Sequence, residues 1–128
     1  MERTLAMDCG DGVRRADNGC WGKGPFAKIA DYTIPASQTG TIFTNGQATG
    51  TVVFTLPPPK PGFWFSFIKT SGNQSLIVRA PAGVTINQGA PGGSYTNNTG
   101  GTATVTVLGM TTSDYAIVTQ MGNWNSSA

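Results

Sequence analysis

From Tyr32 onward the chain is a series of short segments in which apolar residues alternate with polar ones, mostly threonine. The clearest are residues 51–56 and 102–108, where every second residue is apolar. A period of two is typical of a strand with one buried face, because successive side chains point to opposite sides of a sheet. Threonine suits the other face, since β-branched side chains fit a half-buried pleated surface. The alternation therefore predicts strands, with Val52, Phe54, Leu56, Ala103, Val105 and Val107 facing inward.

Turn-forming residues separate eight such segments at intervals of about 8–12 residues. Asn45-Gly46 is a strong turn signal, and residues 88–101, rich in glycine and asparagine, form the longest expected loop. Many short strands with regular turns are typical of a sandwich or barrel. We expect an all-β fold, an eight-stranded antiparallel β-sandwich or jelly-roll-like barrel, with strands at 32–36, 41–44, 51–56, 63–69, 75–79, 84–87, 102–108 and 115–121.

The segment at residues 63–69 differs from the other seven because it is apolar on both faces. Phe63, Phe65 and Phe67 share one face and are expected at the centre of the core. Trp64 and Ile68 share the opposite face, which also needs a cover. A second sheet with a loop, or another subunit, would supply it.

Charge is concentrated at the front of the chain, where ten of the fourteen charged side chains lie within the first 31 residues. Five glycines and a proline interrupt this stretch, and it sustains no period of 2 or 3.6. We expect residues 1–31 to form an extended arm that a partner orders, and residues 32–128 to form the β-domain.

Four residues of this arm are candidate contacts with a partner. Arg14 and Arg15 are the only adjacent basic pair, and they form either a solvated turn or a salt-bridge contact with an acidic surface. Trp21 and Phe26 are its only aromatic residues, and they either dock on a partner or fold back onto their own domain.

Cys9 and Cys20 are the only cysteines, and their spacing matches no zinc motif. Three states stay open for them. They are free thiols, as is usual in the cytosol, or they form an intrachain disulfide that closes a short loop, or they pair between chains.

The body of the chain has little material for acid–base chemistry. It contains no histidine, and Asp114 is its only acid after residue 31. Hydrolysis usually requires paired carboxylates or an activated nucleophile. We expect no catalytic residue, no metal and no cofactor, and a structural or binding role rather than an enzyme.

Other features bear on partners and location. The formal net charge of +2 is small for a nucleic-acid-binding domain. No apolar run approaches the ~20 residues that a membrane helix needs, and the first residues do not read as a secretory signal. We expect neither nucleic acid nor membrane as a partner, and we expect assembly in the cytosol.

Several segments of the body resemble a pattern that recurs in structural proteins of tailed bacteriophages. They are residues 40–45 (GTIFTN), 50–57 (GTVVFTLP), 61–67 (PGFWFSF) and 76–83 (LIVRAPAG), together with residues 114–124, which end in Gly-Asn-Trp. The resemblance covers most of residues 32–124. Such modules occur in capsid decoration (cement) proteins and in fibre or tail attachments.

The resemblance implies a virion β-sandwich on the capsid surface, often a homotrimer, without catalytic residues. Small size and a separate arm favour a cement protein that stabilises the lattice of the major capsid protein. Trp64 and Ile68 would then form the trimer interface, and the arm would contact capsid subunits.

Two alternatives stay open. One is a receptor- or glycan-binding knob of a head fibre or tail, which would bind through Trp64, Tyr95 or Trp124. The other is a β-domain that completes the head or tail in few copies.

Overall fold

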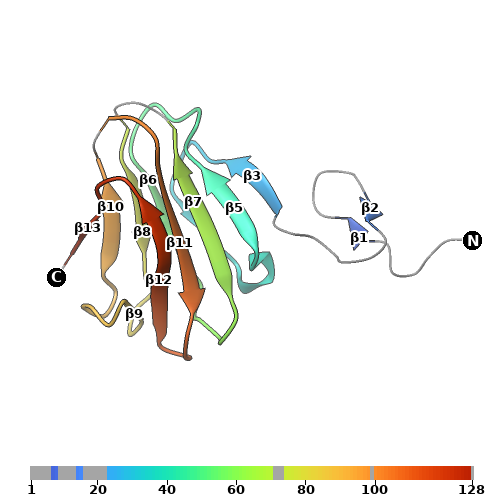
Figure 1. The fold of residues 1–128 in the computed structure, drawn as a ribbon, viewed down its shortest axis with the longest axis vertical. Helices are drawn as coiled ribbons and strands as arrows, with labels where there is room; N and C mark the ends of the chain where they lie inside the picture. The colour runs from blue at the N-terminus through green and yellow to red at the C-terminus, as the bar shows by residue number, and fades with distance from the viewer. Residues whose placement is uncertain (1–6, 9–13, 16–22, 71–73, 99, 128) are drawn as a thin grey trace, which may run out of the picture.

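The computed structural model describes residues 7–8, 14–15, 23–70, 74–98 and 100–127. Apart from one short 3-10 turn, Ala36–Gln38, its regular structure is β. A six-stranded and a five-stranded sheet form two layers (Figure 1). The predicted all-β, sandwich-like fold is therefore confirmed.

The six-stranded sheet has the order β3 (Lys23–Ala27), β5 (Thr41–Thr44), β7 (Trp64–Lys69), β11 (Ala103–Gly109), β12 (Asp114–Met121) and β9 (Thr85–Ile86). The five-stranded sheet has the order β13 (Asn125–Ser126), β10 (Ser94–Asn97), β8 (Leu76–Arg79), β6 (Val52–Thr55) and β4 (Tyr32–Thr33). All eight predicted strands are present, as β4, β5, β6, β7, β8, β9, β11 and β12.

The strands are not antiparallel throughout, so that part of the prediction is wrong. From β3 to β11 the chain crosses to the other sheet at every step (Figure 1). Within the two runs β3–β5–β7 and β4–β6–β8, neighbouring strands are separated by one passage through the opposite sheet, and the strands of each run are parallel. Antiparallel pairing is kept where β11 meets β7 and β12, and where β10 meets β8 and β13.

The core between the sheets is built around stacked and tilted phenylalanine rings. Phe43 and Phe67 of the six-stranded sheet lie with their ring centroids 5.3 and 5.2 Å from that of Phe54 on the other sheet. Each such buried side chain contributes about 1.5–3 kcal/mol through the hydrophobic effect. Eight of the nine predicted inward-facing residues are buried: Val52, Phe54, Leu56, Phe65, Phe67, Ala103, Val105 and Val107. The exception is Phe63, which was expected at the centre of the core. Phe63 is half-buried and packs against this core.

Two polar side chains on the inner side of the six-stranded sheet are satisfied by backbone carbonyls. Lys69 is fully buried because it continues the inward face of β7, and its Nζ donates to the Gly101 carbonyl at 3.1 Å. The Tyr115 hydroxyl of β12 donates to the Pro57 carbonyl, just after β6, at 2.6 Å. The second bond joins one sheet to the end of a strand in the other.

Three strands of these sheets were not predicted. β10 lies within residues 88–101, which we expected to be a loop, and β13 lies in the polar tail. Both are short, polar segments without an apolar alternation, and pairing with β8 and with each other makes them strands. The third is β3, which lies within the expected arm.

The sheet therefore begins at Lys23, and the boundary that we expected at residue 31 is wrong. β3 pairs in parallel with β5, and Phe26 packs against the core of its own domain, which is the folded-back alternative for that side chain. Gly24 has φ +105°, and a Cβ there would lie 2.4 Å from the Ile42 carbonyl oxygen. Glycine is thus required for β3 to approach β5 so closely.

Ahead of β3 the structure describes only β1 (Met7–Asp8) and β2 (Arg14–Arg15), which pair antiparallel with each other. Arg14 and Arg15 thus lie on a short strand. Cys9, Cys20 and Trp21 lie outside the described residues, so the interpretations offered for them stay predictions. Within the described ranges, no helix is long and apolar enough to span a membrane.

Candidate functional site

The outward-facing side of the six-stranded sheet is the first candidate site. We call it the outer sheet face, and the strand alternation and register assign to it Ile42, Thr44, Trp64, Ser66, Ile68, Thr104, Thr106, Leu108, Ala116, Thr119 and Met121. None of these side chains is charged. By the same alternation Asp114, the first residue of β12, also lies on the outer side, at the margin of this face where β12 pairs with β9. Among the described elements, no strand or helix packs across this face.

The register arranges the outer sheet face in rows across the strands. Trp64 lies opposite Leu108, and Ile68 lies beside Thr44 on one side and Thr104 on the other. Between these rows Ser66 and Thr106 share a hydrogen bond of 2.7 Å between their hydroxyls. The hydroxyls thus partly satisfy each other, which lowers the cost of removing the face from water.

Trp64 and Ile68 lie on this face as the alternation predicted, and both are half-buried. The backbone of Trp64 is held by the connection that leads into β5, because its N–H donates to the Thr39 hydroxyl at 3.0 Å and its carbonyl accepts from the Gly40 N–H at 2.7 Å. A Cβ on Gly40 would lie 3.8 Å from the indole. The backbone of Trp64 is thus held by residues 39 and 40, and its indole lies close to Gly40.

Ile68 borders a shallow hollow of about 340 Å³ at one end of the outer sheet face. Pro25 and Ala27 of β3 form one wall, and Thr44 and Thr70 contribute to the rest. Most of this lining is apolar or carries only a hydroxyl group. A protruding apolar side chain of another molecule would fit such a depression.

Exposed apolar side chains continue this surface along β12. Met121 is 52% exposed, and Val118 and Met110 nearby in sequence are 58% and 51% exposed. Beyond Tyr115, β12 pairs only with β11, since β9 covers Asp114 and Tyr115 alone. The second half of β12 is thus an edge as well as part of the outer sheet face.

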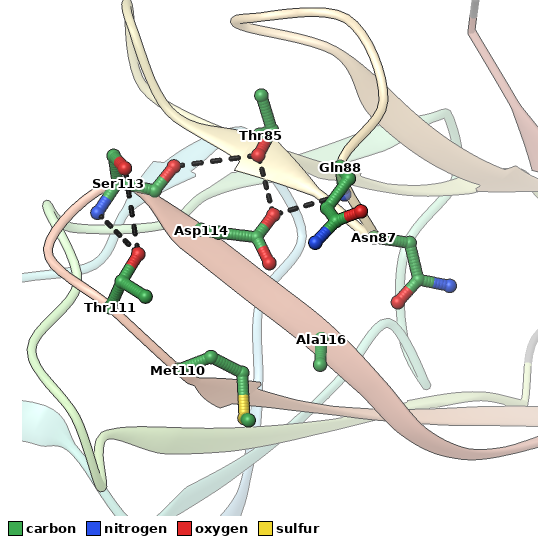
Figure 2. Close-up of a pocket in the computed structure, with 8 residues that line it drawn as sticks. All are labelled: Thr85, Asn87, Gln88, Met110, Thr111, Ser113, Asp114 and Ala116. Carbon is green, nitrogen blue, oxygen red and sulfur yellow. Dashed lines mark hydrogen bonds between the residues drawn. The ribbon is translucent and has the colours of Figure 1, made fainter.

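A second candidate site is a hollow of about 750 Å³ at the start of β12, which we call the Asp114 hollow. Parallel pairing of β9 with β12 brings Thr85 beside Asp114. One carboxylate oxygen of Asp114, Oδ1, accepts from the Thr85 hydroxyl and from the Gln88 N–H at 3.0 Å (Figure 2). Asp114 itself is half-buried.

Two turns frame this hollow on opposite sides of Asp114 (Figure 2). In the turn after β9, Asn87 and Gln88 have left-handed backbones, with φ of +53° and +60°. Asn87 Oδ1 accepts from the Ile117 N–H at 2.9 Å, which ties this turn to β12. In the other turn, the Ser113 N–H donates to the Thr111 hydroxyl at 3.1 Å.

The chemistry of the Asp114 hollow is that of a polar binding site. It offers one carboxylate, two carboxamides and three hydroxyls, with the side chains of Met110 and Ala116 as apolar surface. Among the described residues, no group of three or more His, Cys, Asp or Glu side chains is placed to hold a metal ion.

Sequence reasoning had singled out Asp114 only as a lone acid. Residues 85–88 and 110–116 are far apart along the chain, and in the sequence each consists of one end of an expected strand and the adjoining turn. Only their pairing through β9 and β12 makes them one site. Two consecutive left-handed residues without glycine are unusual, but the amino-acid types did not signal them.

Two aromatic residues considered for a glycan surface lie elsewhere. Trp124 is buried, 8% exposed, and its Nε1 donates to the Met121 carbonyl at 3.1 Å. The idea that it forms an exposed stacking platform is therefore wrong. Tyr95 is half-buried on β10 and packs against the core.

Comparison of the chain with protein-family models finds no match, and a search of curated proteins finds no relative.

Proposed function

We propose that this chain is a structural protein of a tailed-phage virion that decorates the capsid and stabilises the lattice of the major capsid protein. It would act by binding, as a homotrimer, without catalysis, cofactor or nucleic acid. The observation that carries this proposal is the outer sheet face, whose side chains named above carry no charge, with Asp114 at its margin. The proposal that the particle is a phage virion is based on the sequence segments that resemble structural proteins of tailed bacteriophages.

The outer sheet face has the composition of a protein–protein contact. The core of an interface is depleted in charged residues, and Trp and Met are enriched there. Trp64, Leu108 and Met121 supply large apolar side chains, and threonines fill the space between them. Self-association over this face, with Trp64 and Ile68 central to it, would remove these side chains from water.

Attachment to a lattice does not require strong individual contacts. A trimer presents each contact three times, and linked binding events raise the overall affinity without any new contact. A protein that binds only the mature lattice stabilises that state by mass action. The segment ahead of β3, with Arg14, Arg15 and Trp21, is the proposed contact with capsid subunits. Because β3 belongs to the sheet, this capsid contact is assigned to residues 1–22 rather than 1–31.

The first experiment tests self-association by light scattering of the purified full-length chain. A matched pair of variants, Ile68→Lys and Ile77→Lys, places the same charge on the outer side of the six-stranded and of the five-stranded sheet. We expect the native chain and Ile77→Lys to be trimers and Ile68→Lys to be monomeric. A native monomer, or equal behaviour of the two variants, would contradict the interface.

The second experiment tests the role on the particle. Heads of the phage that carries the gene, stripped of the protein, are incubated with the full chain or with a chain that lacks residues 1–22. We expect the full chain to bind in hundreds of copies and to protect heads from heat, and the shortened chain to bind poorly. A few copies per particle would indicate a completion factor instead. Equal binding by the shortened chain would exclude the proposed contact between residues 1–22 and the capsid.

A receptor-binding knob is the competing function. The structure leaves Trp64 as the aromatic residue on the outer sheet face, whereas Trp124 is buried. Binding of the particles to cells that depends on this chain, with no change in head stability when it is removed, would favour the knob.

A further inference from the structure

We propose that the Asp114 hollow binds the ring of a neutral saccharide. The proposal does not depend on the capsid role, because it requires neither self-association nor a head lattice, although the hollow borders the outer sheet face and shares Ala116 with it. It rests on the mixture of groups that the β9–β12 pairing brings together.

The first group is the carboxylate of Asp114. Its Oδ1 is held by Thr85 and Gln88, whereas its second oxygen has no hydrogen-bond partner among the described residues (Figure 2). An ionised carboxylate is a strong acceptor, and hydrogen bonds to it are shorter and stronger than neutral ones. A ligand must therefore bring a donor, and a hydroxyl of a sugar is one.

The other polar groups of the hollow include hydrogen-bond donors, so a fitting ligand must also accept hydrogen bonds. Asn87 uses its Oδ1 for the Ile117 N–H, so its NH₂ is the end left to donate. The hydroxyls of Thr111 and Ser113 donate or accept as needed. Each hydroxyl of a pyranose is both donor and acceptor, so one ring satisfies the carboxylate, the carboxamides and the hydroxyls together.

The hollow also offers apolar surface and suitable size. Met110 is 51% exposed and lies with Ala116 to one side of the carboxylate in Figure 2. A thioether side chain adapts to the shape of its partner, and these groups can cover the C–H face of a sugar. The volume of about 750 Å³ lies within the range of about 300–1,000 Å³ of small-molecule sites.

The frame is already ordered before a ligand arrives. The Thr85, Asn87 and Thr111 side chains all hydrogen-bond within the frame, and Asp114 is fixed from two sides. Binding to a pre-organised site loses less conformational entropy than binding to a loose one. Weak, sugar-sized ligands benefit most from this.

Two other ligand classes fit the hollow less well. A calcium ion takes six to eight oxygen ligands, often from several carboxylates, and the hollow has a single carboxylate. A guanidinium or ammonium group would pair with Asp114 but cannot accept hydrogen bonds. It would make no use of the exposed Asn87 and Gln88 side-chain amides as donors, whereas a sugar hydroxyl can accept from them.

The test is a titration of the ¹⁵N-labelled full chain, followed by NMR, with the methyl glycosides of glucose, galactose, mannose and N-acetylglucosamine. We expect at least one of them to shift the amide signals of Gln88, Ser113 and Ala116, with a dissociation constant of about 1–10 mM. Methylguanidinium is titrated in parallel as a probe for a cation site.

Two variants that each remove one acid provide the comparison. Asp114→Asn keeps an acceptor for Gln88 but removes the charge, and it should weaken glycoside binding at least about tenfold. Asp31→Asn is the control, because exposed Asp31 also accepts one backbone N–H, from Val53 at 3.0 Å, and lies outside the hollow. It should leave binding unchanged.

The proposal is overturned if none of the glycosides shifts these signals up to about 100 mM, well above the expected dissociation constant. It is also overturned if Asp114→Asn binds as well as the native chain. If methylguanidinium shifts these amide signals and no glycoside does, the saccharide proposal is also overturned, and the hollow binds a cationic ligand instead. None of these results bears on trimer formation or head binding, so failure here is distinct from failure of the capsid role.

Discussion

The buried hydrogen bond of Tyr115 can be tested by two measurements. One is the free energy of unfolding at neutral pH, and the other is the change of that free energy at alkaline pH. Its side chain is fully buried, and its hydroxyl donates to the Pro57 carbonyl at 2.6 Å. Its ring meets that of Phe65 edge-on, with centroids 6.4 Å apart. Tyr115→Phe removes the oxygen alone and leaves the ring packing in place.

The expected loss follows from the carbonyl that remains. Pro57 is buried, so its oxygen would have no water to replace the hydroxyl. A buried acceptor left unsatisfied costs about 1–3 kcal/mol. This is a large part of the ~5–15 kcal/mol by which a domain is stable. For a chain of this size the melting temperature should fall by about 4–12 °C.

The same residue predicts a dependence on alkaline pH. Burial raises the pKa of Tyr115, because the interior disfavours the charged phenolate. In the unfolded chain a tyrosine ionises near pH ~10. A raised pKa in the folded state means that the contribution to stability is complete below pH ~10 and is lost as the pH rises toward the folded pKa. Over that window the native chain should lose about 1.4 kcal/mol per pH unit through this group.

The assay is urea unfolding of both proteins at pH 7, 9, 10 and 11, followed by circular dichroism. The free-energy difference between them should be constant up to about pH 9 and then shrink, because phenylalanine does not ionise. Tyr32→Phe is the control, since half-buried Tyr32 donates to Gln38 near the surface, and its loss at pH 7 should be smaller. The reasoning is refuted if Tyr115→Phe is as stable as the native chain at pH 7, or if the difference does not change between pH 9 and 11.

Two further predictions concern the sheet. Phe67→Ala should lower the free energy of unfolding in urea by about 3–5 kcal/mol, because it opens a cavity among stacked rings. Ile68→Ala on the outer sheet face should lower that of the monomer by about 1 kcal/mol or less, and equal losses would contradict the assignment of faces. Gly24→Ala should make β3 susceptible to limited proteolysis, because the added Cβ would collide with the Ile42 carbonyl. Gly50→Ala is the control, since a Cβ there has nothing within 4 Å, and equal cleavage of the two variants would show that β3 is not held by this close approach.

The position of the strands and the direction of their side chains could be predicted because both are local properties. Alternation at residues 51–56 and 102–108 identifies a strand and tells which residues face the core, whatever its neighbours are. The outward position of Trp64 and Ile68 followed from the same rule. The lack of charge on the outer sheet face is likewise a property of the residue types, read with a period of two.

Tertiary structure alone decided which strands are neighbours. A period of two does not state whether the partner runs parallel, so the crossings that make β3, β5 and β7 parallel could not be foreseen. β3, β10 and β13 lack the alternation and are strands because edges of existing sheets pair with them. The Asp114 hollow arises in the same way, since residues more than twenty positions apart meet only where β9 joins β12. The amino-acid sequence thus fixes which side of each strand is apolar through steric and hydrophobic preferences of single residues, whereas contacts between distant strands depend on the free energy of the whole packed domain.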